Sequence, residues 1–447
     1  MFDRQILKNL SSWAERKGRK PLVLRGARQV GKTTAVELFA RQFERYLYFN
    51  LERRQDSRLF ESGLPINDLL QALFLSRDVP RRGGRTLLFL DEIQGSTGAM
   101  SFLRYVHESA PDLHVVAAGS LLEVVLAQAG AGFPVGRVEY LFMHPLRFEE
   151  YMQALELDSA LQAYLTVPFP EYAYETLLPL FHRYVQIGGM PEAVRRYREE
   201  QEIQALTPVY QGLVSSFLDD IGKYAKSGAM TRVLRFALEA APLEAGKRIK
   251  FQGFGRSGYR SREMGEALRI LEQAMLIRLI YPMTGTRLPI QPDLRKSPRL
   301  QYLDTGLLNY TVGLQQSLFM MENLHSVYQG VLAEHIVAQE LIAQGVQSAA
   351  KPVFWVREKQ PSTAEVDFLF PYEGLLVPVE VKAGKSGTLR SLHQFMDRCD
   401  HPWAIRLYAG PLRQETTRTR QGREFQLLNL PYFLAGKLRD HLEHAVG

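Results

Sequence analysis

Two stretches of the sequence combine residue types that could do chemistry. In the first, GARQVGKT at residues 26–33, two glycines separated by four residues are followed directly by lysine and threonine. In the second, VPVEVK, Glu380 and Lys382 stand two positions apart in an otherwise apolar run. Because side chains alternate along a strand, Glu380 and Lys382 are expected to project from one face. The chain could therefore carry one chemistry near each end.

The first stretch matches the phosphate-binding pattern G-x-x-x-x-G-K-[ST], and it lies between an apolar strand and an amphipathic helix. Gly26 and Gly31 permit the sharp turn that surrounds phosphates with backbone N–H groups. Lys32 is expected to reach the β- and γ-phosphates, and Thr33 to offer its hydroxyl to Mg²⁺. The predicted cofactors are therefore ATP and Mg²⁺. The predicted ATP-binding residues are Gly26, Ala27, Arg28, Gln29, Val30, Gly31, Lys32, Thr33, Thr34, Asp91 and Ser120.

Two consecutive carboxylates end the apolar run TLLFLDE. Asp91 is expected at the end of a buried strand, where it could hold the Mg²⁺ of a bound nucleotide together with Thr33. Glu92 is the candidate general base that polarises the attacking water. Such a pair is common as a plain helix cap, so its catalytic interpretation depends on the phosphate-binding loop.

Apolar strands alternate with helical patterns through the first third of the chain, which favours a parallel sheet covered on both faces. The expected strands are residues 21–25, 46–52, 85–92 and 113–120. Together with the two motifs, this order makes residues 1–165 resemble an AAA-type P-loop ATPase domain. The resemblance implies an α/β fold with a three-layer arrangement.

The same resemblance implies roles for two further residues. Ser120, at the end of the run VVAAGS, would be a polar sensor beside the γ-phosphate. Arg137, in Val-Gly-Arg, would be a finger that reaches the nucleotide of a neighbouring subunit and stabilises transition-state charge. The alternative for Arg137 is a solvated loop residue. A finger of this kind implies a homo-oligomer, possibly a hexameric ring.

Carboxylates also surround the second stretch. Asp367 lies 13 residues before Glu380, across the turn PYEG, so a hairpin can bring the two together. Glu334 lies further upstream in an amphipathic helix. Carboxylates held close together repel unless a cation offsets their charge, which indicates a Mg²⁺ site. The alternative is an ordinary ion pair between Glu380 and Lys382 on a half-exposed sheet.

The order helix-Glu, strand-Asp, strand-Glu-x-Lys resembles the PD-(D/E)XK nuclease superfamily. The resemblance implies that Asp367 and Glu380 bind Mg²⁺, that Lys382 orients or activates the attacking water, and that Glu334 completes the site. Val366 stands where the superfamily pattern has proline. Over nearly its whole length the chain resembles a bacterial and archaeal group of AAA ATPases with a C-terminal domain of unknown function. The segments GGMPEAV, YLDTGLLNYTVG and GVLAEHIVAQEL carry that likeness.

The middle of the chain contains a basic stretch without acidic residues, KRIKFQGFGRSGYRSR. Its cations are Lys247, Arg248, Lys250, Arg256, Arg260 and Arg262. Cations so arranged could neutralise DNA phosphates, and the interleaved rings of Phe251, Phe254 and Tyr259 could stack on bases or pack inward. Helical patterns before and after the stretch, followed by two strands, predict a winged helix. The alternative is a lid or protein contact with a solvated charged face.

Composition sets the remaining limits. The net charge of +7 and the single cysteine, Cys399, favour a polyanionic partner and a reducing, cytoplasmic location. No span of about 20 apolar residues predicts a membrane helix. The predicted domains are an ATPase domain (1–165), a helical linker or lid (166–228), a winged helix (229–312) and a nuclease-like mixed α/β domain (313–447).

Three functions are compatible with these patterns. The first is an ATP-hydrolysing DNA-processing protein that remodels or moves along DNA, with a nuclease-like C-terminal domain that grips DNA or cuts it with Mg²⁺ at Asp367, Glu380 and Lys382. The second is an ATPase that binds DNA through a C-terminal domain that does not cut. The third is a nucleotide-operated switch that acts on a protein partner.

Overall fold

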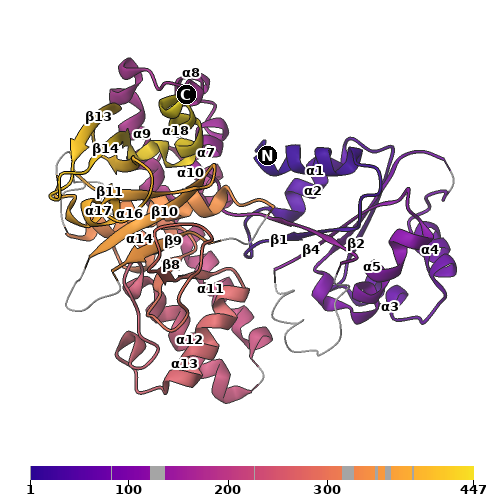
Figure 1. Cartoon of the computed structure of the whole chain (residues 1–447). Coiled ribbons are helices and arrows are strands. Elements are labelled where there is room, and N and C mark those ends of the chain that lie inside the picture. The colour runs from indigo at the N-terminus through magenta and orange to yellow at the C-terminus, as the bar shows by residue number, and fades with distance from the viewer. Residues whose placement is uncertain are drawn as a thin grey trace.

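The computed structural model describes residues 2–81, 83–120, 136–225, 227–314, 327–347, 351–357, 364–384 and 387–447. These residues form two lobes (Figure 1). The first lobe contains the elements up to β5 (Glu139–Phe142), and the second contains the elements from α7 (Phe148–Ala154) onwards. In this described part, no helix is both long and apolar enough to cross a membrane.

A five-stranded parallel sheet forms the centre of the first lobe, with the strand order β2-β3-β4-β1-β5. Its other strands are β1 (Leu22–Arg25), β2 (Arg45–Asn50), β3 (Thr86–Asp91) and β4 (His114–Gly119). The helices of this lobe are α1 (Gln5–Glu15), α2 (Lys32–Ala40), α3 (Arg54–Phe60), α4 (Ile66–Leu75) and α5 (Thr97–Ser109). The predicted α/β fold with a parallel sheet is confirmed.

Both faces of this sheet are buried, because its strands contribute alternately to two hydrophobic cores. On β3, Leu87 and Phe89 belong to the core that includes α2, whereas Leu88 and Leu90 belong to the core that includes α5. This double coverage explains why the strands are continuous apolar runs in the sequence. Since the strands are parallel, the carboxyl ends of β1, β3 and β4 meet at one edge of the sheet.

The second lobe begins with a group of helices. After α7 these are α8 (Asp158–Leu165), α9 (Tyr174–Ile187), α10 (Pro191–Glu200), α11 (Thr207–Tyr224), α12 (Gly228–Ala240), α13 (Ser261–Gln273) and α14 (Thr305–Thr311). Strands β6 (Ile277–Ile280) and β8 (Arg299–Tyr302) form an antiparallel pair. Two helices followed by two paired strands is the element order that the sequence predicts over residues 229–312.

A seven-stranded mixed sheet forms the rest of the second lobe, with the order β13-β14-β12-β11-β10-β9-β7. Its strands are β7 (Pro282–Met283), β9 (Val353–Val356), β10 (Glu365–Tyr372), β11 (Leu375–Lys382), β12 (Trp403–Tyr408), β13 (Arg413–Arg418) and β14 (Glu424–Pro431). The helices of this part are α16 (Val327–Ala343), α17 (Arg390–Met396) and α18 (Leu438–Val446). β10 and β11 form the expected antiparallel hairpin.

The packed units differ from the predicted domain boundaries in two places. β7 comes from the predicted winged-helix segment but pairs with β9 in the C-terminal sheet. α7 and α8 come from residues 1–165 but lie in the second lobe (Figure 1). There the backbone N–H of Phe148 donates to the carboxylate of Glu340 on α16 at 2.9 Å. Hydrophobic periodicity could not reveal this, because an amphipathic helix has the same pattern whichever core it covers.

Candidate functional site

The phosphate-binding loop connects β1 to α2 at the carboxyl edge of the first sheet. Gly31 directly precedes α2 and has a φ of +96°, which glycine adopts without the strain of a side chain. Gly26 is tightly enclosed, because a Cβ there would lie 2.5 Å from the carbonyl oxygen of Met143. The two glycines of the sequence motif are therefore required for different reasons, one for its conformation and the other for space.

Lys32 is buried at the start of α2. Its ammonium donates to the carbonyl oxygens of Gly26 at 3.0 Å and Ala27 at 2.9 Å. Burial lowers the pKa of Lys32 to about 8, although the carboxylates of Glu92 and Asp91 oppose this shift. A buried ammonium this close to the loop is suited to offset the charge of a bound phosphate.

Thr33 and Asp91 meet as the motifs predict. The hydroxyl of Thr33 donates to Oδ2 of Asp91 at 2.9 Å, across the gap between α2 and the end of β3. The hydroxyl of Tyr48 on β2 lies 3.3 Å from the same carboxylate oxygen. A hydroxyl and a carboxylate are oxygen ligands of the kind that Mg²⁺ prefers, so these residues fit the metal of a bound nucleotide.

Glu92 has a strained backbone. Its φ of +51° lies in the left-handed region, which is rare for glutamate and concentrates at functional positions. Gln94 donates from Nε2 to Oε2 of Glu92 at 2.5 Å. Gln94 therefore holds the Glu92 carboxylate close to Asp91. The sequence interpretation missed Gln94, whose position two residues after Glu92 is the only feature in the sequence that could have indicated it.

The structure places Ser120 and Arg137 at opposite edges of the sheet. Gly119 is the register partner of Arg25, so Ser120 follows β4 beside the first residue of the phosphate-binding loop. Arg137 precedes β5 and forms an ion pair with Glu108 of α5. It therefore lies away from the nucleotide loop of its own chain, and its role as a finger stays a prediction.

Helix α11 of the second lobe reaches the phosphate-binding loop, which the sequence interpretation missed. Arg28 of the loop forms an ion pair with the buried Asp220 of α11. Lys223, one turn further along α11, lies 3.2 Å from Asp220 and 3.1 Å from Glu52 after β2. The hydrogen bond to Asp220 raises the pKa of Arg28. Periodicity could not predict this contact, because the paired residues lie 192 positions apart.

The segments GGMP and YLDTG, which carry part of the family likeness, meet in a second buried joint. Asp304 accepts the backbone N–H of Gly189 at 2.6 Å and that of Leu307 at 3.1 Å. A Cβ on Gly306 would lie 1.9 Å from the carbonyl oxygen of Ile187, so the two segments are in close backbone contact. Burial raises the pKa of Asp304 to about 6, even though these hydrogen bonds oppose the shift.

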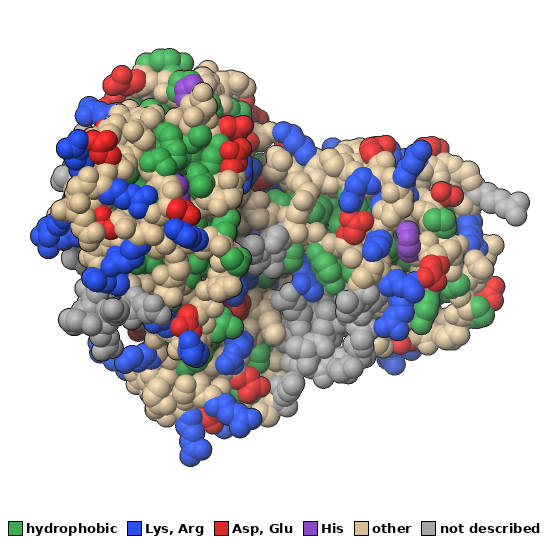
Figure 2. Space-filling view, in the orientation of Figure 1, with side chains coloured by type: hydrophobic (Ala, Val, Ile, Leu, Met, Phe, Trp, Pro, Cys, Tyr) green, Lys and Arg blue, Asp and Glu red, His purple; other side chains and the backbone are tan. Residues whose placement is uncertain are grey.

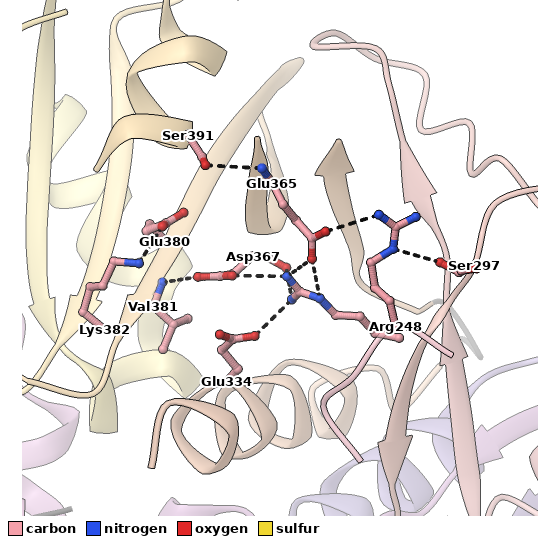
Figure 3. A network of polar contacts seen from close by, with 10 residues as sticks. Arg248, Ser297, Glu334, Glu365, Asp367, Glu380, Val381, Lys382 and Ser391 are labelled. Atoms are coloured by element: carbon pink, nitrogen blue, oxygen red, sulfur yellow. Dashed lines mark hydrogen bonds and ion pairs between the residues drawn. The ribbon is translucent and has the colours of Figure 1, made fainter. Parts of the chain in front are cut away.

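The four predicted residues of the second site converge near the β10–β11 hairpin (Figure 3). Asp367 accepts the backbone N–H of Val381 at 2.8 Å, and Lys382 donates to Oε1 of Glu380 at 2.7 Å. Glu334 approaches from α16. Burial, followed by the nearby charge of Asp367, raises the pKa of both Glu334 and Glu380 to about 8.

A fifth residue, Arg299 of β8, lies among these carboxylates. Its guanidinium lies 3.3 Å from Oε2 of Glu334 and 3.3 Å from Oδ1 of Asp367, and it also pairs with Glu365. The described residues contain no group of three or more His, Cys, Asp or Glu side chains arranged to hold a metal ion. A guanidinium therefore offsets part of the carboxylate charge, and the metal site expected at Glu334, Asp367 and Glu380 stays a prediction.

In the basic stretch of the second lobe, the six cationic side chains are exposed, whereas the aromatic rings are buried or half-buried. Phe254 is buried, and Tyr259 packs against Phe236 with ring centroids 5.5 Å apart. These two rings therefore pack inward, one of the two roles that we considered for them. Arg248 lies 3.6 Å from Glu365 and donates to the carbonyl oxygen of Ser297, so it points towards the carboxylate cluster (Figure 3).

Lys250 of this stretch lines an open groove of about 310 Å³ together with two cations that the sequence interpretation missed. These are Arg295 and Lys296, from the loop before β8. None of the described residues that line the groove is acidic. Tyr281 and Phe251 contribute aromatic surface.

Comparison with protein families divides the chain into three parts. Residues 18–152 match the AAA domain, residues 178–318 match one domain of unknown function, and residues 329–433 match another. No curated protein matches the chain.

Solved structures with some similarity include three ATP- or DNA-related proteins. A Walker-type ATPase of Pyrococcus abyssi is 16% identical with a TM-score of 0.45, over 70% of this chain and 96% of that one. The ORC2 protein of Aeropyrum pernix is 14% identical with a TM-score of 0.32, over 70% and 92%. The RuvB Holliday junction branch migration motor of Thermotoga maritima is 16% identical with a TM-score of 0.28, over 62% and 90%. These scores are too low to carry an argument about function.

The match to the AAA domain covers the loop, the strand ends and the sheet order described above. The parallel sheet brings Lys32 and Thr33 to the same edge as Asp91 and Glu92, and this sheet has the P-loop ATPase fold. The first lobe of this chain is therefore an AAA-type P-loop ATPase domain.

Proposed function

We propose that this protein hydrolyses ATP in its first lobe and uses the resulting movement to act on DNA bound by its second lobe. The observation that carries the proposal is the joined set of Lys32, Thr33, Asp91 and Glu92. Lys32 would offset the charge of the β- and γ-phosphates, and Thr33 with Asp91 would hold Mg²⁺. When bound, Mg²⁺ supplies further neutralisation of phosphate charge. Glu92 would accept a proton from the water that attacks the γ-phosphate.

The DNA part of the proposal is supported by the groove beside the winged-helix segment. Lys250, Arg295 and Lys296 lie along it without an acidic neighbour in its lining. Cations in a row neutralise phosphates and release their counterions, whatever the base sequence. The net charge of +7 agrees with a polyanionic partner.

The link between the two activities would be α11. Its Asp220 pairs with Arg28 of the phosphate-binding loop, and α11 packs against α12, the helix that precedes the basic stretch. A phosphate in the loop would compete with Asp220 for the guanidinium of Arg28. Nucleotide binding would in this way change how the second lobe is held.

An ATPase assay with single-stranded, duplex and branched DNA tests the proposal most directly. We expect DNA to stimulate ATP turnover, and Lys32→Ala to abolish it with every DNA. Slow turnover that no DNA changes would instead favour the nucleotide-operated switch with a protein partner. Arg137 belongs to the proposal as a finger in a homo-oligomer, and mixing Arg137→Ala with Lys32→Ala subunits should restore part of the activity. A strictly monomeric active protein in light scattering would exclude that finger.

A further inference from the structure

The carboxylate cluster of the second lobe contains more negative charge than its resemblance to a nuclease site requires. Four carboxylates take part: Glu334, Glu365, Asp367 and Glu380. They come from α16, β10 and β11, three elements of the C-terminal part. Unpaired, they would repel one another in a buried place. What balances them decides what the cluster does.

Arg299 meets three of these carboxylates with one side chain. Its Nε donates to Oε1 of Glu365 at 2.8 Å, and Nη1 lies 3.3 Å from Oε2 of Glu334. Asp367 is contacted twice, through its carbonyl oxygen at 3.2 Å and through Oδ1 at 3.3 Å. A guanidinium has five N–H donors in a rigid fork, so it can serve several acceptors at once where a lysine could not.

The position of Arg299 is built into the fold. Its side chain is only 10% exposed, and its guanidinium carbon lies 4.6 Å from the centroid of the Phe354 ring. Arg299 also forms an isolated backbone bridge with Arg248, whose side chain lies 3.6 Å from Oε2 of Glu365. Arg248 and Arg299, both from the middle of the chain, therefore pair with the same glutamate, Glu365 of the C-terminal sheet.

The charges of the cluster nearly cancel without a metal ion. Lys382 lies 2.7 Å from Glu380, so three cations, Lys382, Arg248 and Arg299, stand against the four carboxylates. A divalent cation on Asp367 and Glu334 would compete with Arg299, which already contacts an oxygen of each. Removing one partner from a buried ion pair leaves an uncompensated charge and is strongly unfavourable.

We propose that the cluster is an ionic joint in which Arg299 permanently takes the charge role of a metal ion. The joint fastens β8, which follows the DNA-facing groove, to α16 and β10 of the C-terminal sheet. β7 makes the same connection by pairing with β9. The middle and C-terminal segments then form one rigid body, and the cluster does not bind a divalent cation. The proposal requires neither ATP hydrolysis nor DNA binding, so it stands or falls independently of the proposed function.

Mn²⁺ binding to the full-length, nucleotide-free protein tests the absence of a metal site. Electron paramagnetic resonance counts the bound Mn²⁺ per chain in wild type, Asp367→Asn and Glu334→Gln. We expect both variants to bind as much Mn²⁺ as wild type, because neither residue is a ligand. Asp91→Asn is the matched control, since it removes a carboxylate from the nucleotide site, where Mn²⁺ can bind. A site that is lost in Asp367→Asn or Glu334→Gln, but kept in Asp91→Asn, would overturn the proposal.

Thermal unfolding tests the joint itself. We expect Arg299→Gln to lower the unfolding midpoint of the second lobe by about 5 °C or more, because three carboxylates lose a shared partner. Arg295→Gln is the control, since this arginine of the same segment is exposed and pairs only locally with Asp293. Its midpoint should shift by less than about 1 °C. Equal midpoints for the two variants would overturn the joint.

A double-mutant cycle separates the joint from a general folding defect. If Arg299 acts by pairing with Asp367, then Arg299→Gln combined with Asp367→Asn should lower the midpoint by clearly less than the sum of the two single changes. Arg299→Lys provides a variant that folds if Arg299→Gln does not, and its midpoint should fall between those of wild type and Asp367→Asn/Arg299→Gln. Additive changes in the cycle would overturn the pairing of Arg299 with Asp367.

Discussion

Lys32 and Glu92 have different partners in the nucleotide site, and this difference determines what each substitution removes. Lys32 lies against the loop that surrounds the phosphates, whereas Glu92 is held by Gln94 beside Asp91. We expect Lys32→Ala to weaken ATP binding by about 10- to 100-fold, since it removes a charge-assisted hydrogen bond. Glu92→Gln should bind ATP normally but hydrolyse it about 10²- to 10⁴-fold more slowly. Calorimetry and single-turnover hydrolysis measure the two effects separately.

Lys8→Ala is the matched control for this pair, because Lys8 is an exposed lysine on α1. It should change neither binding nor hydrolysis. Normal hydrolysis by Glu92→Gln would remove the assignment of Glu92 as the base, while leaving Lys32 as the phosphate-binding residue.

Asp304 makes the stability of the second lobe depend on pH. Burial raises its pKa in the folded protein to about 6, above the value of about 3.9 for an unfolded aspartate. The folded state therefore binds the proton more tightly, so this group stabilises the fold at low pH and loses that effect as the pH rises from about 4 to 6. The change amounts to about 3 kcal/mol at most.

The comparison of wild type with Asp304→Asn isolates this effect from the other titrating groups. The asparagine does not titrate, but its one carbonyl oxygen replaces only one of the two carboxylate oxygens that accept from Gly189 and Leu307, so the variant is also destabilised by an amount that does not depend on pH. Between pH 4.5 and 7, the midpoint of wild type should fall relative to that of the variant in thermal unfolding. A difference between the two proteins that is independent of pH would show that Asp304 keeps its charge in the folded state.

Whether the role of a residue can be predicted from the sequence depends on how far along the chain its partners lie. Lys32, Thr33 and Asp91 belong to motifs whose geometry is local to a loop and a strand end, so their meeting was predictable. Asp220 and Arg299 carry no such local sign. Their partners lie 192 and 68 positions away, and an isolated aspartate on a helix or arginine on a strand is typical of a solvated surface. At the second site the sequence likewise shows the carboxylates but not the arginine that pairs with them.

Helix α11 connects the nucleotide site to the second lobe, and Asp220 is its contact with the phosphate-binding loop. Asp220→Asn removes the ion pair with Arg28, so the guanidinium becomes available to a bound phosphate. We expect ATP to bind up to roughly tenfold more tightly, which corresponds to about 1.4 kcal/mol. DNA should stimulate turnover less than in wild type, because the proposed link between the loop and α11 depends on this ion pair. Calorimetry and the ATPase assay measure both.

Asp219→Asn is the control for this prediction, since Asp219 is the exposed neighbour of Asp220 on the same helix. It removes the same charge without touching the ion pair, and it should leave both measurements unchanged. Equal behaviour of the two variants would show that α11 only packs against the loop and does not respond to the nucleotide.

The strands and helices were easier to predict than their assignment to a lobe. The strands of the first sheet are continuous apolar runs because both faces are buried, and this is visible in the sequence. β7 is only two residues long and pairs with β9 across about 70 positions, so it has no pattern of its own. α7 presents an ordinary amphipathic face, and its lobe is visible only in three dimensions, where Phe148 packs against Phe181 and Tyr184 of α9 and its backbone N–H donates to Glu340.

In the molecule as a whole, we expect DNA to lie in the groove that precedes β8 in the second lobe. Figure 2 shows lysine and arginine side chains spread over both lobes, so net charge alone does not locate a binding site. In the groove, Lys250, Arg295 and Lys296 face a common space of about 310 Å³ without an acidic lining residue. Cations that share one groove can neutralise successive phosphates, and of the three only Arg295 forms an ion pair within the described residues, with the neighbouring Asp293 outside the lining.

Replacing Lys250, Arg295 and Lys296 together by alanine should weaken binding equally for DNA duplexes of unrelated sequence, because cations on phosphates do not read bases. The slope of log affinity against log salt concentration should decrease by about 0.9 for each phosphate that the variant no longer neutralises. Basal ATPase activity without DNA should remain. Fluorescence anisotropy at several salt concentrations measures the slope, and Arg256, Arg260 and Arg262 replaced together test the neighbouring exposed cations.

Lys8, Lys17 and Arg41 are the control set, three exposed cations of the first lobe whose replacement by alanine changes the net charge by the same amount. If attraction to DNA came from net charge, this triple variant and the groove variant would bind DNA equally weakly. If the groove holds the backbone, only the groove variant changes the salt slope, because counterions are released only where a cation neutralises a phosphate. Equal slopes in the two variants would show that the groove is an ordinary solvated surface. The ATPase of the first lobe would then act on a partner other than DNA.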